Sequence, residues 1–350
     1  MDGHSDDTTV AVDVMGADNG VSVFVRGVVY AAKNFPSELG NIVLVGHGDE
    51  IGRAVSENKL EKFFKKINIV HASQEVEMTD KPISALRSKK DSSMFRAIEL
   101  VKDGYADGML SCGNTGCLMA GGALKLRTMP GIDRPALCTM IPAPDYAFAL
   151  IDVGANPSST AKNLVHNAVL GSHYFKTVTN VENPRIGLLT IGTEEGKGSD
   201  LVCEAHRLLK LASKEINYSG LIEGFQLFDG TVDVVVCDGF VGNILLKSVE
   251  AMAKTIKAYI RREIRKNPLR MLGAVLASGA FLDIKKQLNP DKFNGAPFLG
   301  LNGTIIKSHG SSSVEGISSA LRLACKTARA SKFGALSEVI KRVNLAINQV

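Results

Sequence analysis

Six Gly-rich loops contain most of the residues in this sequence that could do chemistry. Each follows a short apolar run and combines glycine with Asp, Asn, Ser, Thr or Lys, at residues 13–18, 111–116, 152–156, 191–198, 238–243 and 303–311. Glycine lets backbone N–H groups approach an anion, and the start of a following helix adds unpaired donors and a favourable dipole. Together these loops predict a site for phosphate or an acyl phosphate.

Three side chains in these loops are candidates for catalysis: Lys197, Asn243 and His309. Lys197 lies between two glycines, where its charge could contact phosphate or an oxyanion. Asn243 starts a predicted helix, so its amide and the adjacent N–H groups could stabilise an oxyanion or polarise a carbonyl. His309 stands in a polar loop and is better placed for acid–base chemistry than the histidines on helical stretches.

The same loops supply the predicted contacts to phosphate or substrate: Asp13, Gly16, Gly113, Asn114, Thr115, Gly116, Asn156, Gly192, Thr193, Gly196 and Lys307. A structural role is the alternative for each loop, because caps occur at every helix start. Ser312 and Glu315 have the spacing of a capping box, and Asn114 could cap the next helix. Asp152 and Asp238 could brace turns. The agreement of six loops favours a functional site.

Other chemistries fit the sequence less well. Residues 192–198 resemble a Walker A loop, but three residues separate the glycines and Gly198 follows the lysine, so an ATPase is not expected. Residues 46–52 resemble a dinucleotide fingerprint with its last spacing one residue too long. The six cysteines include no Cys-x-x-Cys pair and lie in or beside apolar runs, which indicates reduced core residues and no metal site.

Length and composition narrow the class of protein. A chain of 350 residues with 45% hydrophobic and 22% charged residues is typical of a soluble globular protein, not of a disordered, fibrous or disulfide-scaffold one. The net charge of +5 is too small to indicate nucleic-acid binding. The first nine residues include three Asp and no apolar core, so we expect no targeting peptide and a cytoplasmic location.

Short β-branched runs alternate with amphipathic stretches along almost the whole chain. This alternation predicts an α/β fold with a mostly parallel sheet and helices on both faces, in one domain covering residues 1–350. The predicted strands are residues 9–14, 41–45, 67–71, 108–111, 136–141, 148–153, 185–191, 232–237 and 304–307. The predicted helices are residues 21–34, 92–103, 115–127, 161–177, 200–213 and 243–262, with two more within 314–347.

The helix predicted from Asn243 shows the clearest periodicity. Leu245, Val249, Met252 and Ile256 recur every three or four residues, so this face is expected to lie against the sheet. The helix leads into a basic segment, residues 254–286, which holds nine basic and two acidic residues around an uncharged run at 271–282. The remaining chain therefore carries a small negative net charge.

The uncharged run of twelve residues is too short to span a bilayer. A core or dimer-interface helix is one interpretation of it. Because basic residues flank it, insertion into the interface of an anionic membrane is the other interpretation, with the segment protruding from the domain. The residues proposed for such docking are Arg261, Arg262, Arg265, Leu272, Leu276 and Phe281.

The loops resemble the signature blocks of a known family, the bacterial acyl-ACP:phosphate acyltransferases of phospholipid synthesis (the PlsX family). The resemblance extends in order from about Thr9 to Lys332, and the blocks Gly-Thr-Glu-Glu-Gly-Lys-Gly at 192–198 and Lys-Ser-His-Gly at 307–310 are highly specific. Ala17 replaces a second glycine of the family, and Cys112 and Cys117 replace alanines. These small-for-small changes affect only the detailed shape of two turns.

The resemblance implies a doubly wound α/β/α sandwich like that of phosphotransacetylases and transfer of a long-chain acyl group from acyl carrier protein to inorganic phosphate. It also implies a homodimer, no organic cofactor, work at the inner membrane surface, and delivery of acyl phosphate to a membrane glycerol-3-phosphate acyltransferase. The resemblance also indicates Lys197 as the residue that contacts phosphate or the oxyanion. Because acyl carrier protein is acidic, the basic segment could receive it instead of a membrane.

Three rival functions remain open from the sequence. A phosphate acetyltransferase using acyl-CoA would need the same fold and phosphate loops. A nucleotide-dependent dehydrogenase is disfavoured by the spacing of both fingerprints. A non-catalytic scaffold for lipid enzymes at the membrane surface would need neither Lys197 nor the six loops.

Overall fold

The computed structural model describes residues 8–16, 20–63, 68–144, 146–194, 196–287, 290–330 and 334–348. Some residues of the predicted features lie outside these ranges: Ala17 and Asp18 of the first loop, Ile67 of a strand, Glu195 of the fourth loop and residues 331–333 of the C-terminal helical stretch. The basic segment also includes Lys285 and Lys286, whose side chains are not described by the structure.

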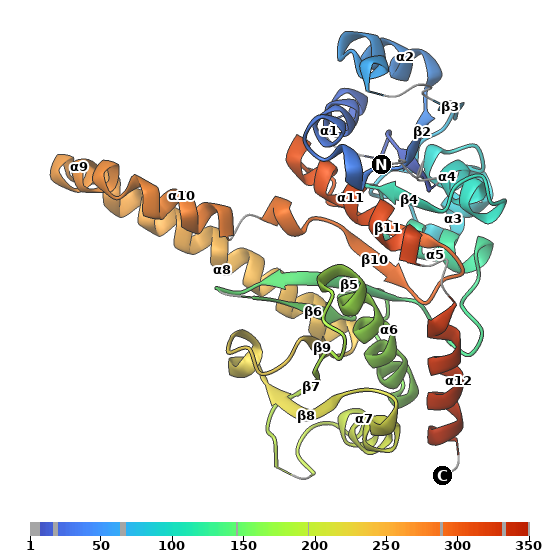
Figure 1. The fold of residues 1–350 in the computed structure, drawn as a ribbon, viewed down its shortest axis with the longest axis vertical. Helices are drawn as coiled ribbons and strands as arrows, with labels where there is room; N and C mark the ends of the chain where they lie inside the picture. Colours follow the sequence, from blue (N-terminus) through green and yellow to red (C-terminus); the bar gives the residue numbers. More distant parts are fainter. Residues whose placement is uncertain are drawn as a thin grey trace, which may run out of the picture.

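A mixed sheet runs through the whole molecule (Figure 1). Its strand order within the described residues is β3-β2-β1-β4-β11-β10-β5-β6-β9-β7-β8. The strands are β1 Thr9–Asp13, β2 Asn41–Gly46, β3 Asn68–His71, β4 Gly108–Ser111, β5 Ala136–Pro142, β6 Ala147–Ile151, β7 Ile186–Thr190, β8 Tyr218–Glu223, β9 Val234–Val236, β10 Ala296–Leu299 and β11 Thr304–Lys307. All nine predicted strands are present, with ends that differ by at most two residues.

Strands β8 and β10 were not predicted, and each has a local reason. Strand β8 lies at the edge of the sheet and includes Gly220, whose φ is +109°. Strand β10 has only four residues and contains Pro297, a residue that normally argues against a strand inside a sheet. Both strands therefore lack the apolar β-branched run from which the others were predicted.

The centre of the sheet reverses direction. Pairings β11–β10, β10–β5 and β5–β6 are antiparallel, whereas the pairings on either side of them are parallel. Three successive reversals make β6 run opposite to β11. The loops after β6, β9 and β7 therefore leave strands that run opposite to β1, β4 and β11, but the register aligns Ile151 at the end of β6 with Ile306, one residue before the end of β11.

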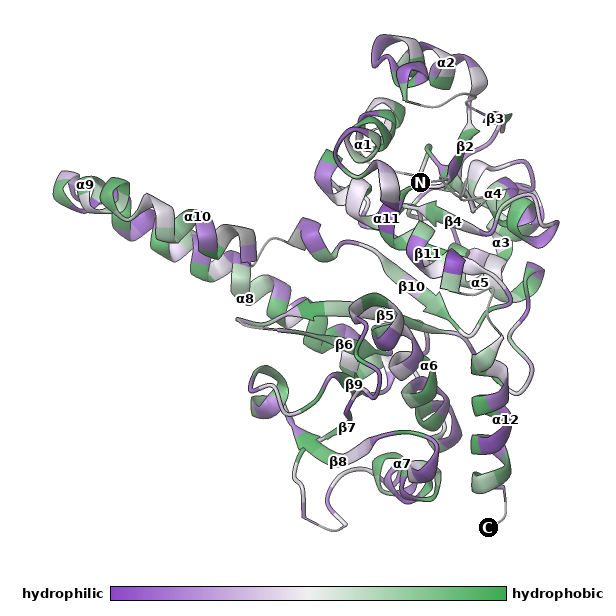
Figure 2. Cartoon of the chain, in the orientation of Figure 1, coloured by the Kyte–Doolittle hydropathy of each residue, from purple (hydrophilic) through white to green (hydrophobic). Residues whose placement is uncertain are grey.

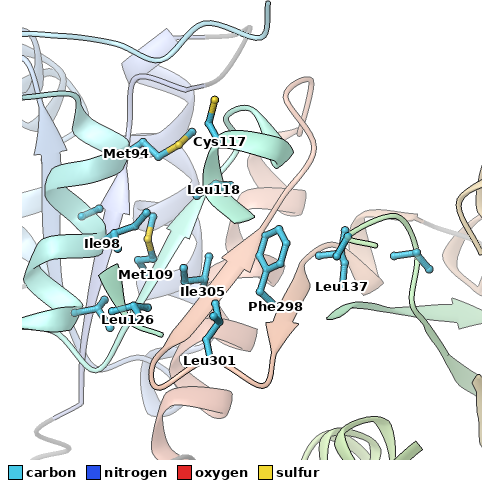
Figure 3. Close-up of a cluster of buried hydrophobic side chains, with 14 of the residues drawn as sticks. Met94, Ile98, Met109, Cys117, Leu118, Leu126, Leu137, Phe298, Leu301 and Ile305 are labelled. Carbon is cyan, nitrogen blue, oxygen red and sulfur yellow. The ribbon is translucent and has the colours of Figure 1, made fainter. Parts of the chain in front are cut away.

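Helices cover both faces of the sheet, as predicted (Figure 1). Three hydrophobic clusters fill the space between them: one under α1 and α11, one under α4 and α5, and one under α6, α7 and α12. In the second, Met94 and Ile98 of α4 and Leu118 of α5 pack over Ile305 and Phe298 of the central strands (Figure 3). The helices are α1 Gly20–Asn34, α2 Gly48–Glu57, α3 Pro82–Ser88, α4 Ser93–Lys102, α5 Thr115–Lys125, α6 Ala161–Thr179, α7 Asp200–Leu211, α8 Gly239–Arg265, α9 Pro268–Leu276, α10 Ser278–Gln287, α11 Val314–Ala330 and α12 Ala335–Ile347.

Helix α8 leaves the body of the molecule and leads into α9 and α10, which form a projecting arm (Figures 1 and 2). Only its first turns touch the core, where Leu245 and Leu246 pack partly buried. Further along, Met252, Ile256 and Tyr259 are exposed. The expectation that this apolar face lies on the sheet is therefore wrong beyond the first turns, where α8 has left the body of the molecule. The predicted helical protrusion is present.

Candidate active site

Asp13 connects two loops at one edge of the sheet. Its buried carboxylate accepts a hydrogen bond of 2.7 Å from Ser111 Oγ and one of 3.3 Å from the Met15 N–H group. Burial raises the pKa of Asp13, and the hydrogen bonds act against that rise. A Cβ atom at Gly16 would lie 2.9 Å from Gly113 Cα, so the two loops are in close contact. Asp13 and Gly16 thus shape this pair of loops.

Helix α5 begins at Thr115 with open backbone donors. The cap is Asn114, whose Oδ1 accepts a hydrogen bond of 3.1 Å from the Cys117 N–H group and whose Nδ2 donates to the Met78 carbonyl at 2.8 Å. The capping alternative is therefore correct for the Asn114 side chain. The N–H groups of Asn114, Thr115 and Gly116 make no hydrogen bond within the described residues. They form an opening suited to an anion at a helix N-terminus.

Lys307 holds the loop after β11 beside the loop after β4. Its Nζ donates to the Cys112 carbonyl at 3.0 Å and to the Ser308 carbonyl. The Ser308 N–H group donates in turn to the Ser111 carbonyl at 2.9 Å. The ammonium group that was predicted to contact phosphate binds backbone carbonyls in this structure.

The cap of α11 is Ser313, whose Oγ accepts a hydrogen bond of 3.1 Å from the Gly316 N–H group. The capping box predicted for Ser312 and Glu315 is therefore wrong by one residue. Ser312 Oγ instead donates to the His309 carbonyl at 2.6 Å. This contact folds the loop back on itself and fixes the backbone of His309.

His309 faces the start of the projecting arm. Its Nδ1 accepts a hydrogen bond of 3.2 Å from the Ser311 N–H group, so the ring is held on one side. Partial burial and the positive charges of Lys307, Lys247 and Lys254 lower the pKa of His309. The last two lysines belong to α8, so this helix lies within electrostatic reach of the loop after β11.

A pH titration tests this arrangement. We expect the His309 ring to titrate below its ordinary pKa of 6.5, and replacing Lys247 by Gln to raise that pKa because one nearby positive charge is removed. Since the folded protein binds this proton less readily than the unfolded chain, His309 contributes stability that declines as pH falls below about 6.5. The measurement is NMR of the ring protons. A midpoint above 6.5, or no change in the Lys247 variant, would contradict the arrangement.

In the other half of the sheet, the loop after β6 is built around Asp152. Its carboxylate accepts hydrogen bonds of 3.2, 3.0, 2.8 and 2.8 Å from the N–H groups of Leu137, Gly154, Ala155 and Asn156. Asn156 Nδ2 adds a fifth at 2.9 Å and also donates to a backbone carbonyl at 2.7 Å. Asp152 therefore braces a turn, and the predicted substrate contact Asn156 is itself buried in that turn.

Asn243 is not at the start of its helix, in contrast to the prediction. Helix α8 begins at Gly239, and the side chain of Asp238 caps it by accepting hydrogen bonds from the N–H groups of Phe240 and Val241. The Gly239 N–H group binds a backbone carbonyl, so the first donors of this helix are occupied. Asn243 is exposed one turn later and lies over Gly154, whose added Cβ atom would be 3.5 Å from Asn243 Oδ1.

Lys197 lies in an exposed loop that follows β7. Its ammonium pairs with Glu194 Oε1 at 2.6 Å, and both side chains are more than half exposed. The ion pair with Glu194 raises the pKa of Lys197, so the lysine is charged at neutral pH. Gly196 has a φ of +84°, a backbone conformation that glycine adopts without strain. The predicted contacts Gly192 and Thr193 lie in the same loop.

The loops fall into two groups that follow strands of opposite direction. One group follows β1, β4 and β11; the other follows β6, β9 and β7. Helix α8 connects them, because Asn243 and Lys247 share one face at a spacing of four residues and Lys247 acts on the pKa of His309. Lys247 was not among the predicted site residues, although its spacing from Asn243 could have indicated it.

The cysteines are poorly suited to nucleophilic catalysis. Five of them are buried, Cys203 is partly exposed, and none forms a disulfide. Burial raises the pKa of Cys112, the cysteine beside the open end of α5, to about 11. A thiol with that pKa is almost fully protonated near neutral pH. This supports the prediction that the cysteines are reduced core residues.

Comparisons with a family model and with individual relatives indicate the same family. A family model described as "Fatty acid synthesis protein" matches residues 8–333. A phosphate acyltransferase of Alcanivorax borkumensis is 43% identical over 92% of this chain and 94% of its own length. A phosphate acyltransferase of Shewanella woodyi is 42% identical over 98% of this chain and 99% of its own.

Solved structures show the same fold. A phosphotransacetylase of Streptococcus pyogenes superposes with a TM-score of 0.60 at 18% identity, covering 93% of this chain and 94% of that one. A branched-chain phosphotransacylase of Enterococcus faecalis gives a TM-score of 0.58 at 15% identity, covering 92% and 99%. These likenesses confirm the predicted phosphotransacetylase-like α/β sandwich.

Proposed function

Since the chain belongs to the phosphate acyltransferase family, we propose that it transfers a long-chain acyl group from acyl carrier protein to inorganic phosphate. A phosphate oxygen attacks the thioester carbonyl and forms a tetrahedral oxyanion. Collapse of this intermediate breaks the carbon–sulfur bond and releases acyl phosphate and the carrier thiolate, which then takes up a proton. Because a thiol has a pKa near 8.5, it leaves without strong acid catalysis, and His309 has a secondary role at most.

The open N-terminus of α5 carries this proposal. Three consecutive backbone N–H groups, from Asn114 to Gly116, point away from any partner among the described residues. They can hold the phosphate nucleophile without an additional charged side chain. Lys197 can exchange its exposed ion pair with Glu194 for a substrate anion at little cost, because exposed ion pairs are weak. The exposed amide of Asn243 is assigned to the oxyanion or the carbonyl.

One assay tests the proposed reaction. The purified protein is supplied with acyl carrier protein thioester, acyl-CoA and phosphate, separately and in pairs, and acyl phosphate is trapped with hydroxylamine. We expect product only when phosphate and the carrier thioester are both present. Product formed from phosphate and acyl-CoA, but not from phosphate and the carrier thioester, would favour a CoA-dependent enzyme. No product in any combination would favour a non-catalytic scaffold.

We also propose that the arm α8–α10 supports assembly and membrane contact. The apolar face of α8 is exposed in the single chain, which supports a homodimer with a mass near twice 37.3 kDa by light scattering. Acyl phosphate would then pass to a glycerol-3-phosphate acyltransferase in the membrane. Within the described residues no helix is long and apolar enough to cross a bilayer, so contact would be at the surface.

Vesicle flotation tests the membrane contact. Leu276 is 81% exposed at the end of α9 and Leu272 is 56% exposed, and the cations Arg262 and Arg265 lie in the last turn of the preceding helix α8. Replacing Leu276 by Glu should reduce binding to anionic phosphatidylglycerol vesicles by about tenfold, because a charge would enter the interface. Leu345→Glu, at a leucine that is 65% exposed on α12, is the matched control. Equal flotation of both variants and the unaltered protein would exclude this contact.

A further inference from the structure

We infer that the outer face of α3 is the surface on which the acidic carrier protein docks, an inference that rests on the proposed function. Two large apolar side chains are exposed here: Ile83 is 69% exposed and Met78 is 53% exposed. A shallow groove runs along the same face, lined by Lys81, Pro82, Ile83, Ser84, Arg87 and Ser88.

The charge of this face fits an acidic partner. The charge of Lys89 is compensated, since its Nζ forms an ion pair with Asp80 at 2.6 Å. In contrast, Lys81, Arg87 and Lys90 are exposed and form no ion pair within the described residues. Of these, Lys81 and Arg87 line the groove beside Ile83, so this face matches an acidic, amphipathic protein surface, and such charges steer association.

The position of α3 is the second argument. Its segment is fastened to the open end of α5: Asn114 Nδ2 donates to the carbonyls of Met78 at 2.8 Å and Asp80 at 3.1 Å. A Cβ atom on Gly116 would lie 3.1 Å from Pro82 Cγ, and α3 and α5 lie side by side (Figure 1). A carrier presents its thioester on a flexible prosthetic arm, so its docking surface must adjoin the phosphate site without forming it.

The basic groove on α8 fits this requirement less well. It is lined by residues from Lys254 to Lys266. At 1.5 Å per residue this groove begins about 16 Å from Asn243 and ends about 34 Å from it, on the projecting arm. Only its first residue, Lys254, lies within electrostatic range of His309, and a carrier bound along the rest of the groove would hold its thioester farther out on the arm.

The test compares two acyl donors. In the variant Lys81→Glu/Arg87→Glu, we expect KM for acyl carrier protein thioester to rise about tenfold and to lose its dependence on salt concentration. The KM for acyl-pantetheine, a small thioester without a protein part, should change less than about twofold, and this reading also shows that the variant is folded. Ile83→Ser should raise KM for the carrier donor alone. Arg53→Glu, at an exposed arginine on α2, is the matched control and should alter neither KM.

Two results would overturn the inference, and they differ from each other. If the unaltered protein makes acyl phosphate from the carrier thioester and the α3 variants keep its KM, the docking surface is wrong; a higher KM in Arg262→Glu/Arg265→Glu would then place the carrier on α8. If the unaltered protein makes no acyl phosphate from the carrier thioester but does so from acyl-pantetheine, the proposed donor is wrong, and the docking inference falls with it.

Discussion

Replacing Lys197 by Ala should lower kcat/KM for acyl phosphate formation by about 10² to 10³, the usual effect of removing one donor to a developing oxyanion. The Lys197 side chain is exposed and its ammonium pairs only with Glu194 in the described structure. Its removal should therefore leave folding unchanged. The measurement is trapping of acyl phosphate with hydroxylamine at saturating phosphate, with circular dichroism to verify the fold.

Glu194→Gln is the matched control, because it removes the partner of Lys197 and leaves the positive charge in place. It should retain activity within a few-fold. Lys197→Arg should recover part of the loss, since it keeps the charge but changes its geometry. Near-normal turnover in Lys197→Ala would show that the lysine is not catalytic, and an equal loss in Glu194→Gln would mean that the loop conformation, not the lysine charge, matters.

The sequence predicted the strands well because most of them are buried on both faces. Runs such as Val10–Val12 and Val234–Val236 are fully buried, and a continuous apolar run is the signature of that environment. The helix caps at Ser92 and Ser199 also follow from residue type, since both accept a hydrogen bond from the third residue of their helices. These properties are local, so a single sequence contains them.

The arrangement of the loops could not be predicted in the same way. Whether β6 runs with or against β11 depends on the short strand β10, which lies between β11 and β5. Because β10 contains Pro297, its sequence does not indicate a strand inside a sheet. Once that strand is missed, the reversal is missed, and all six loops are expected to follow strands of one direction. The exposed face of α8 is a similar case, because periodicity shows that a face is apolar and does not show what covers it.

For the site residues too, local features could be predicted from the sequence, whereas roles that depend on the three-dimensional arrangement could not. A Gly-rich loop after a strand indicates a tight turn, but not whether the turn serves a ligand or the fold. Asn114 illustrates both at once: its side chain ties α5 to the Met78 carbonyl, while its backbone N–H group stays open. Asp152 and Asn156 brace the fold in this structure, since five hydrogen bonds close the turn around one carboxylate, and the contact of Asn156 with substrate stays a prediction.

The largest effect on stability is expected at Asp152. Replacing it by Ala should lower the free energy of unfolding by about 3–4 kcal/mol, because several buried donors lose their only acceptor and cannot all reach water. The donors belong to the start of β5, at Leu137, and to the turn at residues 154–156, so the loss affects the centre of the sheet. The measurement is urea denaturation followed by circular dichroism.

Two variants make this expectation specific. Asp152→Asn keeps one oxygen that can accept from Leu137, Gly154 and Ala155, but turns an amide NH₂ group toward the donors of Asn156, so an intermediate loss is expected. Asp238→Ala removes a partly exposed helix cap and should cost about 1 kcal/mol. If Asp152→Ala were as stable as the unaltered protein yet inactive, the carboxylate would belong to the chemistry and not to the turn. A loss of stability in the order Asp152→Ala, Asp152→Asn, Asp238→Ala would instead place this residue with the fold, since only a bracing role depends on the number of donors satisfied.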